Sequence, residues 1–494
     1  MRLVAILLSA LLFALAPALP VKAQDIPSEV TLFKNVNVFD GRSETLLEGY
    51  DVLVVGNLIR QVARDIPTSG TYKLDVRTGR LEPGAWRHRE SSGYKLLVPG
   101  ADGQVETREV AARVIDGRGG TLMPGLIDVH THLSLNSQID KAVLEKPWMY
   151  TGVKAGIVAT QMLMRGFTAV RDAGGPVGGL QQAIDEGLLP GPRVYSSGPF
   201  LSQTGGHFDL DPSAQYISPY FTGVPYRTTL FGWVYLADGV AEVQKASREI
   251  LRTGAAQIKI ATGAGLASLW DPLHQWQYTP EEVAAIVYEA KKMDTYVMAH
   301  SFHPEGTRIA VEAGVRSIEH GYNTDDETLR AMVEKNVFLA TQFYLYSGAD
   351  VTEMGFPPGD PRRPAIEEAL SNFDDLFRRA KAAGVKMPFS TDLFGEPETL
   401  AQQSLEFTSR AAYFTPHEIL VQATSMGAEL LGYSGMQNPY RAGPLGVIED
   451  GAYADLLIVD GNPLEDISLL ADPEANLALI MKDGIVYKNA FEGQ

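Results

Sequence analysis

The chain has 494 residues, 45% of them hydrophobic and 21% charged, so it can bury a large core, and wholesale disorder is excluded. Its 60 acidic and 42 basic residues give a net charge of -18, which argues against a nucleic-acid partner and against binding to an anionic membrane surface. There is no cysteine, so disulfides, thiolate nucleophiles and cysteine-ligated zinc are excluded.

Residues 1–23 have the pattern of a secretory signal peptide. Arg2 precedes a nearly unbroken aliphatic run, and small residues surround a cleavable bond after Ala23. The alternative is a membrane anchor, but the run before Pro17 is shorter than the roughly 20 apolar residues that an anchor needs. We therefore expect an exported protein, periplasmic or secreted, with no membrane attachment after cleavage near Ala23.

Short β-like segments occupy both ends of the remaining chain. Runs such as residues 52–55 and 454–459 are bounded by Gly, Asn and Asp turn signals. Because two similar β-rich ends flank a different middle, we predict one small β-sandwich domain built from residues 24–120 and 439–494. Within it, residues 68–113 are polar and show little periodicity, so we expect them to form a loop-rich insertion.

The middle of the chain, residues 121–438, alternates between apolar strand-like runs and helical patterns. Thr279 and Thr415 are each followed by a Pro at the first helical position and a Glu at the third, which marks a helix start. Eight strand-like runs over about 300 residues indicate an α/β fold with a (β/α)₈ TIM-type barrel, although a doubly wound open sheet fits the pattern too. The runs end at His130, Arg171, Tyr195, Ile260, His300, His320, Thr341 and Ser390.

The strand ends of this predicted barrel carry most of the reactive side chains. Residues at the C-terminal ends of barrel strands line one mouth, where catalysis takes place in this architecture. His130 and His132 are two positions apart, so in an extended strand both point the same way and can ligate one metal ion. Four of the nine histidines lie at such ends, together with a lysine and an aspartate. The candidate metal ligands are His130, His132, Lys259, His300, His320 and Asp392.

The segments around these residues resemble the amidohydrolase superfamily over nearly all of the chain after residue 23. Within the superfamily the pattern is most similar to the metal-dependent prolidase-like group, which includes Xaa-Pro dipeptidases and ochratoxin-type amidases. Residues 204–207 and 237–240 support this narrower placement. The superfamily-wide matches are residues 123–132, 166–172, 257–260, 317–321, 390–392 and 451–458.

The resemblance implies a centre with two divalent metal ions, for which zinc is the default. The two histidines of the first strand would hold one ion with Asp392, and the histidines of strands five and six would hold the other. An ordinary ammonium group cannot ligate a cation, so Lys259 would be carboxylated on its side-chain nitrogen and bridge the ions. A Lys259 that pairs with Asp392 beside a single ion is the alternative.

The same resemblance implies an amide hydrolase. A hydroxide that bridges the two ions attacks a carbonyl group, and Asp392 acts as the general acid/base that passes the proton to the leaving nitrogen. His207 and Tyr235 are candidate catalytic and substrate-binding residues, and Arg227 is a candidate clamp for a substrate carboxylate. We expect the substrate to be an Xaa-Pro-like dipeptide or an N-acyl amino acid and the assembly to be a homo-oligomer.

Other functions stay open at this point. An imidazolonepropionase-like relative would use the same site to open a cyclic amide or a lactone. A protein that keeps the barrel and the metals without turnover would be a binding protein, although it would have no use for the base Asp392. A serine hydrolase is disfavoured because no Gly-x-Ser-x-Gly segment occurs in the sequence.

Overall fold

The computed structural model describes residues 29–74, 81–83, 93–99, 104–137, 145–210, 222–266, 271–346, 351–352 and 357–491. The predicted signal peptide, residues 1–23, lies outside the described residues. The chain divides into two compact units, a smaller one that contains Thr68–Ala112 and a larger one made of Thr31–Pro67 and Arg113–Gln494. Within the described ranges, no helix has both the length and the apolar character needed to span a bilayer.

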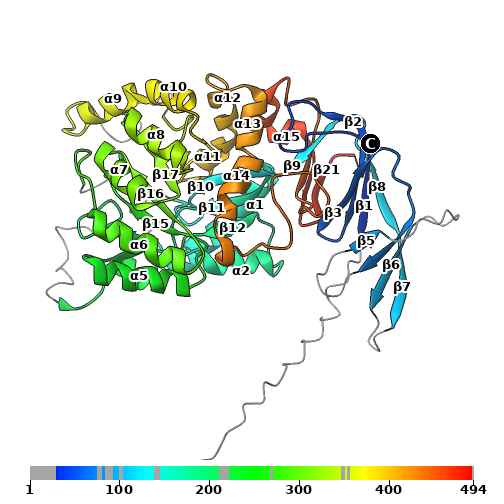
Figure 1. The fold of residues 1–494 in the computed structure, drawn as a ribbon, viewed down its shortest axis with the longest axis horizontal. Coiled ribbons are helices and arrows are strands. Elements are labelled where there is room, and N and C mark those ends of the chain that lie inside the picture. The colour runs from blue at the N-terminus through cyan, green and yellow to red at the C-terminus, as the bar shows by residue number, and fades with distance from the viewer. Residues whose placement is uncertain are drawn as a thin grey trace, which may run out of the picture. The chain divides into compact units, whose positions relative to one another are not determined.

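Parallel strands alternate with helices over most of the larger unit (Figure 1). One parallel sheet has the order β10-β11-β12, and another has the order β14-β13-β15-β16-β17-β18. This alternation is that of an α/β fold, as the sequence pattern predicted. The strands are β10 (Leu126–Thr131), β11 (Phe167–Asp172), β12 (Arg193–Ser196), β13 (Phe200–Ser202), β14 (Val234–Leu236), β15 (Ile258–Ala261), β16 (Val297–Ser301), β17 (Ser317–His320) and β18 (Phe338–Ala340).

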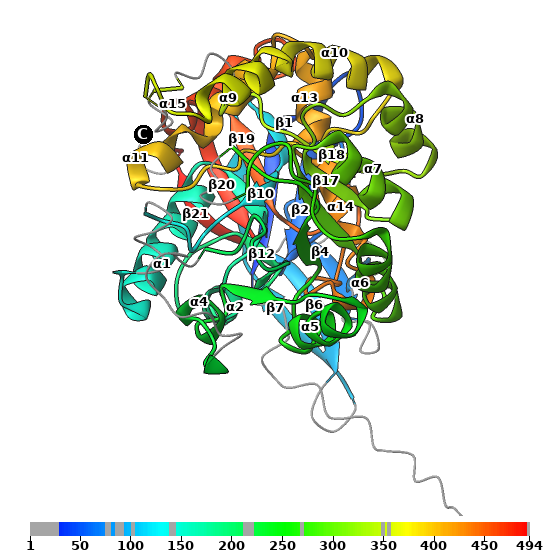
Figure 2. The same ribbon diagram turned by 90° about the vertical axis from the view of Figure 1, so that its left-hand side faces the viewer.

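Helices are arranged around these strands (Figure 2). The two predicted helix starts are confirmed, because Thr279 and Thr415 each form a capping box with the Glu three residues later. The helices are α1 (Trp148–Met164), α2 (Gly178–Asp185), α4 (Arg227–Leu230), α5 (Val240–Arg252), α6 (Pro280–Lys292), α7 (Pro304–Ala313), α8 (Asp326–Glu334), α9 (Arg363–Ser371), α10 (Phe373–Ala383), α11 (Pro397–Leu400), α12 (Glu406–Arg410), α13 (Pro416–Gln422), α14 (Ser425–Gly432) and α15 (Pro473–Asn476).

The eighth predicted strand of this part is not a regular strand. The segment still lies between β18 and β10, because Leu339 donates its backbone N–H to Lys386 and Asp392 donates to the carbonyl of His130, each at 2.9 Å. Pro388 has no N–H to give to a ladder, which explains why regular pairing is interrupted here. The hydrogen bond from Asp392 ties this segment to the end of β10.

Strands from both ends of the chain share one sheet of the larger unit. Its order is β21-β20-β19-β9-β1-β2-β3, with β8 paired to β1. The antiparallel pairing of β19 with β9 joins a strand from the end of the chain to one that precedes the α/β part. The two β-rich ends therefore meet, as the sequence pattern suggested. The strands are β1 (Val30–Val38), β2 (Leu47–Val55), β3 (Leu58–Ala63), β8 (Ala112–Asp116), β9 (Thr121–Pro124), β19 (Leu456–Val459), β20 (Leu477–Lys482) and β21 (Ile485–Asn489).

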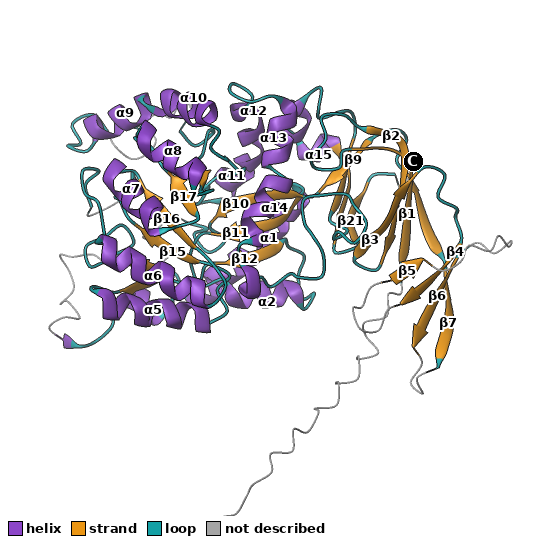
Figure 3. Cartoon of the chain, viewed as in Figure 1, coloured by secondary structure: helices purple, strands orange, loops and turns teal. Residues whose placement is uncertain are grey.

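The smaller unit contains strands within residues 68–113, the segment for which the sequence predicted a loop-rich insertion. Its described residues form a four-stranded sheet in the order β5-β4-β6-β7 (Figure 3). Tyr94, Leu96 and Val98 are fully buried and alternate with more exposed residues, a short two-residue period that the surrounding polar residues obscure in the sequence. The strands are β4 (Gly70–Leu74), β5 (Leu81–Pro83), β6 (Tyr94–Pro99) and β7 (Val105–Val110).

Candidate metal centre

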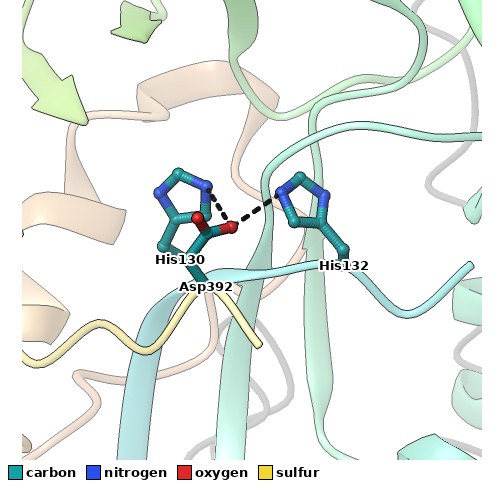
Figure 4. A group of neighbouring side chains, drawn as sticks. All are labelled: His130, His132 and Asp392. Atoms are coloured by element: carbon teal, nitrogen blue, oxygen red, sulfur yellow. Dashed lines mark ion pairs between the residues drawn. The ribbon is translucent and has the colours of Figure 1, made fainter. Parts of the chain in front are cut away.

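The end of β10 directs two histidines at one carboxylate (Figure 4). Oδ1 of Asp392 lies 3.3 Å from Nε2 of His130 and 3.2 Å from Nε2 of His132. One ligand atom from each of the three side chains lies within 4.8 Å of the other two. The spacing of two residues along an extended strand puts both imidazoles on the same side, as the sequence predicted.

Neighbouring parallel strands carry the other three candidates to the same place. Nζ of Lys259, from β15, lies 3.4 Å from Nε2 of His130. Nδ1 of His320, at the end of β17, lies 3.8 Å from Oδ2 of Asp392. The ring of His300, from β16, lies 4.5 Å from that of His320 between ring centroids. All six predicted ligands therefore lie in one cluster.

Burial favours the neutral form of the imidazoles of His130, His300 and His320. The exposed fraction of the six residues runs from 0% at His130 to 7% at Asp392. Burial lowers the pKa of His130 and of His300 well below the ordinary value, and it lowers the pKa of His320 to about 3. A neutral imidazole has a nitrogen lone pair, and this is the form that ligates a metal ion.

Lys259 and Asp392 respond to the same burial in different ways. Burial lowers the pKa of the Lys259 ammonium group to about 8, so a fraction of this side chain is a neutral amine near pH 7. Burial alone would raise the pKa of Asp392, but the hydrogen bond from His132 and the positive charge of Lys259 hold it below its ordinary value. Asp392 is therefore an anion at neutral pH.

Two of the six residues have left-handed backbone, which is uncommon for residues with a side chain. φ is 67° at His320 and 53° at Asp392. Such a conformation costs on the order of 1–3 kcal/mol and persists only where the surrounding structure imposes it. At Asp392 the 2.9 Å hydrogen bond to the carbonyl of His130 does so, and it holds the carboxylate beside the two histidines.

A buried ion pair behind the cluster was missed in the sequence. Oε2 of Glu319 lies 2.6 Å from Nδ1 of His130, and Arg171 donates to both oxygens of Glu319 at 2.9 Å. A carboxylate accepts, so the His130 proton sits on Nδ1, and Nε2 is left facing Asp392. The signal that could have revealed the pair was two charged residues inside apolar strand runs, at Arg171 in β11 and Glu319 in β17.

Two further buried acids brace the segments that carry the ligands. Asp128 accepts from the hydroxyl of Thr391 at 2.5 Å and from the amide of Gln403 at 2.9 Å. Asp172 accepts from the backbone N–H of Leu133 at 2.8 Å. Burial raises the pKa of both acids to about 6. Thr391 directly precedes Asp392 and Leu133 directly follows His132, so these bonds fix the approach to the cluster.

His207 stands at the border of the cluster. Its ring stacks on that of His300 with the centroids 3.8 Å apart. Nδ1 of His207 lies 3.4 Å from Oδ2 of Asp271, and its backbone N–H donates to Gln277 at 3.0 Å. The side chain of His207 is 14% exposed, so it is in a position to touch both the buried ligands and an incoming molecule.

Tyr235 and Arg227, the other two predicted substrate residues, have their contacts elsewhere. Burial raises the pKa of the Tyr235 phenol, and the negative charge of Glu249 in α5 raises it further. The guanidinium of Arg227 donates to the carbonyl of Lys146 at 3.1 Å and lies 4.8 Å from the centroid of the Phe231 ring. Among the described residues, no hydrogen bond or ion pair joins either side chain to the six clustered residues.

The chain is similar in sequence and structure to known hydrolases. Residues 121–493 match the model of the Amidohydrolase family. Ochratoxinase from Aspergillus niger is 29% identical over 412 residues, which cover 80% of this chain and 81% of that protein. An amidohydrolase of known crystal structure is 34% identical with a TM-score of 0.77, and the match covers 94% of this chain and 100% of that one. A prolidase crystallised with N-methylphosphonate-L-proline is 33% identical with a TM-score of 0.76, over 93% of this chain and 100% of that one.

These similarities extend over the residues that form the centre. The family match spans every strand that carries a candidate ligand, from β10 to the segment of Asp392. The solved structures indicate a TIM-barrel-like α/β fold, consistent with the parallel strands described above. From the family match and these relatives, the chain belongs to the amidohydrolase family, in its prolidase-like group, and is a hydrolase that acts on amide or peptide bonds.

Proposed function

We propose that this hydrolase contains two divalent metal ions and cleaves an Xaa-Pro-like dipeptide or an N-acyl amino acid. The observation that carries the proposal is the meeting of six potential ligands from five separate segments in one buried cluster, with two imidazoles within 3.3 Å of the same Asp392 oxygen. The similarity to a prolidase and to ochratoxinase supports a small amide as the substrate.

The donor set fits a pair of small divalent cations. Imidazole nitrogens together with a carboxylate oxygen are ligands that suit zinc, and the chain offers no thiolate that would compete. His130, His132 and Asp392 would hold one ion, and His300 and His320 would hold the other. When bound, the ions lower the pKa of water and polarise the carbonyl group of the substrate.

Lys259 is the residue we assign to the bridge between the ions. Its neutral amine adds carbon dioxide and releases one proton, which converts the side chain into a carbamate anion with two oxygens. An ammonium group has no lone pair and would repel the cations. The lowered pKa of Lys259, about 8, supports this chemistry because the neutral amine is the form that reacts.

The protein's own side chains then hold and move the proton. Oδ1 of Asp392 faces the imidazoles of His130 and His132, and Oδ2 lies 3.8 Å from Nδ1 of His320, so the carboxylate lies among the ligands. We assign to Asp392 the removal of a proton from the attacking water and its delivery to the leaving nitrogen. We assign to His207, at the border of the cluster, contact with the substrate. Glu319 keeps His130 in the required tautomer.

The proposal extends to the architecture of the larger unit and to its location in the cell. A hydrogen bond of 2.8 Å from Ala256 to Ser196 and the bonds beside Asp392 support closure of the parallel sheets into a (β/α)₈ barrel of residues 121–438. The sheet that joins both chain ends supports a small β-sandwich domain. The pattern of residues 1–23 supports export with loss of that segment.

A substrate panel tests the proposed activity. The protein lacking residues 1–23 would be assayed with zinc, cobalt or manganese against Xaa-Pro dipeptides, N-acyl amino acids, cyclic amides and lactones. We expect the highest kcat/KM on one of the first two classes. A clear preference for lactones or cyclic amides, or no hydrolysis of any amide with any of the three metals, would contradict the proposal.

A further inference from the structure

The four-stranded sheet of the smaller unit has an open edge at β7. Among the described residues no strand pairs with β7 on the side away from β6 (Figure 3). Residues 105–109 are all exposed, and Val105 keeps 62% of its surface accessible. The edge of a sheet presents unpaired N–H and C=O groups, which another strand can use. β7 is therefore able to accept a further strand.

Hydrogen bonds inside the sheet determine which β7 residues face this edge. Gly70 of β4 donates its N–H to the carbonyl of Gly93 at 3.3 Å, so odd-numbered residues of β6 direct their backbone groups toward β4. Even-numbered residues, such as Leu96, direct theirs toward β7, where Leu96 pairs with Arg108. The backbone N–H and C=O of Arg108 therefore point toward β6 and away from the open edge.

The residues on either side of Arg108 face the open edge, because backbone direction alternates along a strand. The outward-facing residues are Val105, Thr107 and Glu109. Two antiparallel strands can exchange hydrogen bonds only where outward-facing residues of both lie opposite each other. For two copies of β7 this condition allows a register centred on Thr107 and registers centred one residue to either side.

Charge selects one of these registers. With Thr107 opposite Thr107 of a second copy, Glu106 of each strand lies opposite Arg108 of the other. A register centred on residue 106 places two Glu106 side chains together, and one centred on residue 108 places two Arg108 side chains together. Opposite charges directly across a strand pair attract, and like charges there are destabilising. Only the register centred on Thr107 gives attraction.

Both of these charges are available for pairing. Neither Glu106 nor Arg108 forms an ion pair within the described part of the chain. The third charged residue of the strand, Glu109, lies on the other face of the sheet and pairs with Lys95 at 3.0 Å. The charges without a partner are therefore the two that meet across the register centred on Thr107.

We propose that β7 is an interface between two copies of this chain, which pair their β7 strands antiparallel about a two-fold axis at Thr107. The contact is isologous, so the Glu106–Arg108 pair occurs twice. The two four-stranded sheets become one continuous sheet across the axis, with the order β5-β4-β6-β7 on each side. Hydrogen bonds from Thr107, Val105 and Glu109 complete the ladder.

Charge reversal tests the register in the full chain without residues 1–23. Sedimentation across a dilution series would compare the parent with Arg108→Glu, with Glu106→Arg and with the double variant. Each single variant places like charges opposite each other, so we expect its dimer dissociation constant to rise about tenfold or more. The double variant restores opposite charges, and its constant should return to near that of the parent. A parent that is monomeric throughout, or a single variant that associates as the parent does, would overturn the proposal.

Cross-linking tests the position of the two-fold axis. Because the chain has no cysteine of its own, only the introduced thiols can form a disulfide. Thr107→Cys puts two thiols opposite each other, with Cα atoms about 5.5 Å apart, which is within the range for a disulfide. Glu109→Cys is the matched control, because its two copies lie ~14 Å apart in this register. Mild oxidation should give covalent dimers of the first variant only. Equal cross-linking of both variants, or none of Thr107→Cys, would refute the register.

Discussion

The buried cluster at the strand ends and the exposed strand β7 carry their charged residues in opposite ways. In the cluster, six polar side chains are buried, and ligand atoms of His130, His132 and Asp392 lie within 4.8 Å of one another. On β7, the charges of Glu106 and Arg108 remain in solvent. Burying an ionisable group is costly unless it has a partner, so the buried cluster indicates a bound ligand such as a metal ion. The exposed charges of β7 find partners only when a second strand pairs with β7 in the register centred on Thr107.

Removal of the general base should have the largest effect. Asp392→Asn keeps the size and one oxygen of the side chain but cannot accept a proton, so we expect kcat to fall by about 10²–10⁴-fold while metal remains bound. Metal content and steady-state kinetics would be measured together. Asp460→Asn, at an exposed aspartate, is the control and should behave as the parent. Near-normal turnover of Asp392→Asn would show that the proton is handled elsewhere.

Removal of Lys259, the proposed bridge between the metal ions, should have the next largest effect on activity. Lys259→Ala removes the carbamate, so we expect metal content to fall and activity to be lost with it. A short carboxylic acid such as acetate should occupy the vacated space and restore part of both. Lys245→Ala, at an exposed lysine of α5, is the control for loss of a surface amine. Full metal content and full activity in Lys259→Ala would exclude a bridging role.

Substitution of Glu319, the partner of His130, should have a smaller effect than substitution of Asp392 or Lys259. Glu319→Gln retains the shape and an acceptor for Nδ1 of His130, but it removes the negative charge that makes the imidazole a stronger ligand. We expect metal affinity to fall about 10–100-fold, with kcat at saturating metal much less affected. A metal titration with activity as the readout separates the two effects. A fall in kcat that excess metal does not reverse would contradict the positioning role.

The ligand positions could be predicted because buried strands appear in the sequence as short apolar runs. A histidine or aspartate at the end of an apolar run stands out, and parallel strands bring such ends together. The Glu319–Arg171 pair was missed because it depends on which strands become neighbours. The sheet at residues 68–113 was missed because its buried positions, such as Tyr94 and Leu96, are too few to reveal a period. Tyr235 lies in β14, and its surroundings are set by tertiary contacts that no local pattern encodes.

A buried carboxyl group outside the cluster, that of Glu406, should make the stability of the protein depend on pH. Glu406 accepts from the backbone N–H groups of Phe343 and Tyr344 and from Arg410, and burial raises its pKa to about 7. In the unfolded chain the pKa is about 4.3, so between these values the native state binds more protons. This group therefore makes the free energy of unfolding fall as pH rises from about 4.3 to 7, and adds no further change above that.

Chemical denaturation at pH 5 and at pH 7.5 checks this effect. Glu406→Gln cannot titrate, so the difference in unfolding free energy between the two pH values should change in the direction that removes this contribution. Arg410 keeps carbonyl partners at Thr341 and Pro388, which lets the variant fold. An unchanged difference between parent and variant would show that Glu406 is ionised throughout this range.

The smallest effect on catalysis should come from the exposed strand. Arg108→Glu alters association by the argument above, but Arg108 lies on a solvent-exposed strand and carries no candidate ligand. We expect its kcat and KM on the best substrate to match those of the parent. A loss of activity as large as that of Glu319→Gln would mean that the two regions are coupled.

Metal analysis of the parent protein tests the central claim most directly. Protein without residues 1–23 would be produced with zinc and bicarbonate, freed of loosely bound ions by gel filtration, and measured by elemental mass spectrometry against protein concentration. We predict a value near two ions per chain. A fully active protein with a single ion, or with none, would contradict it.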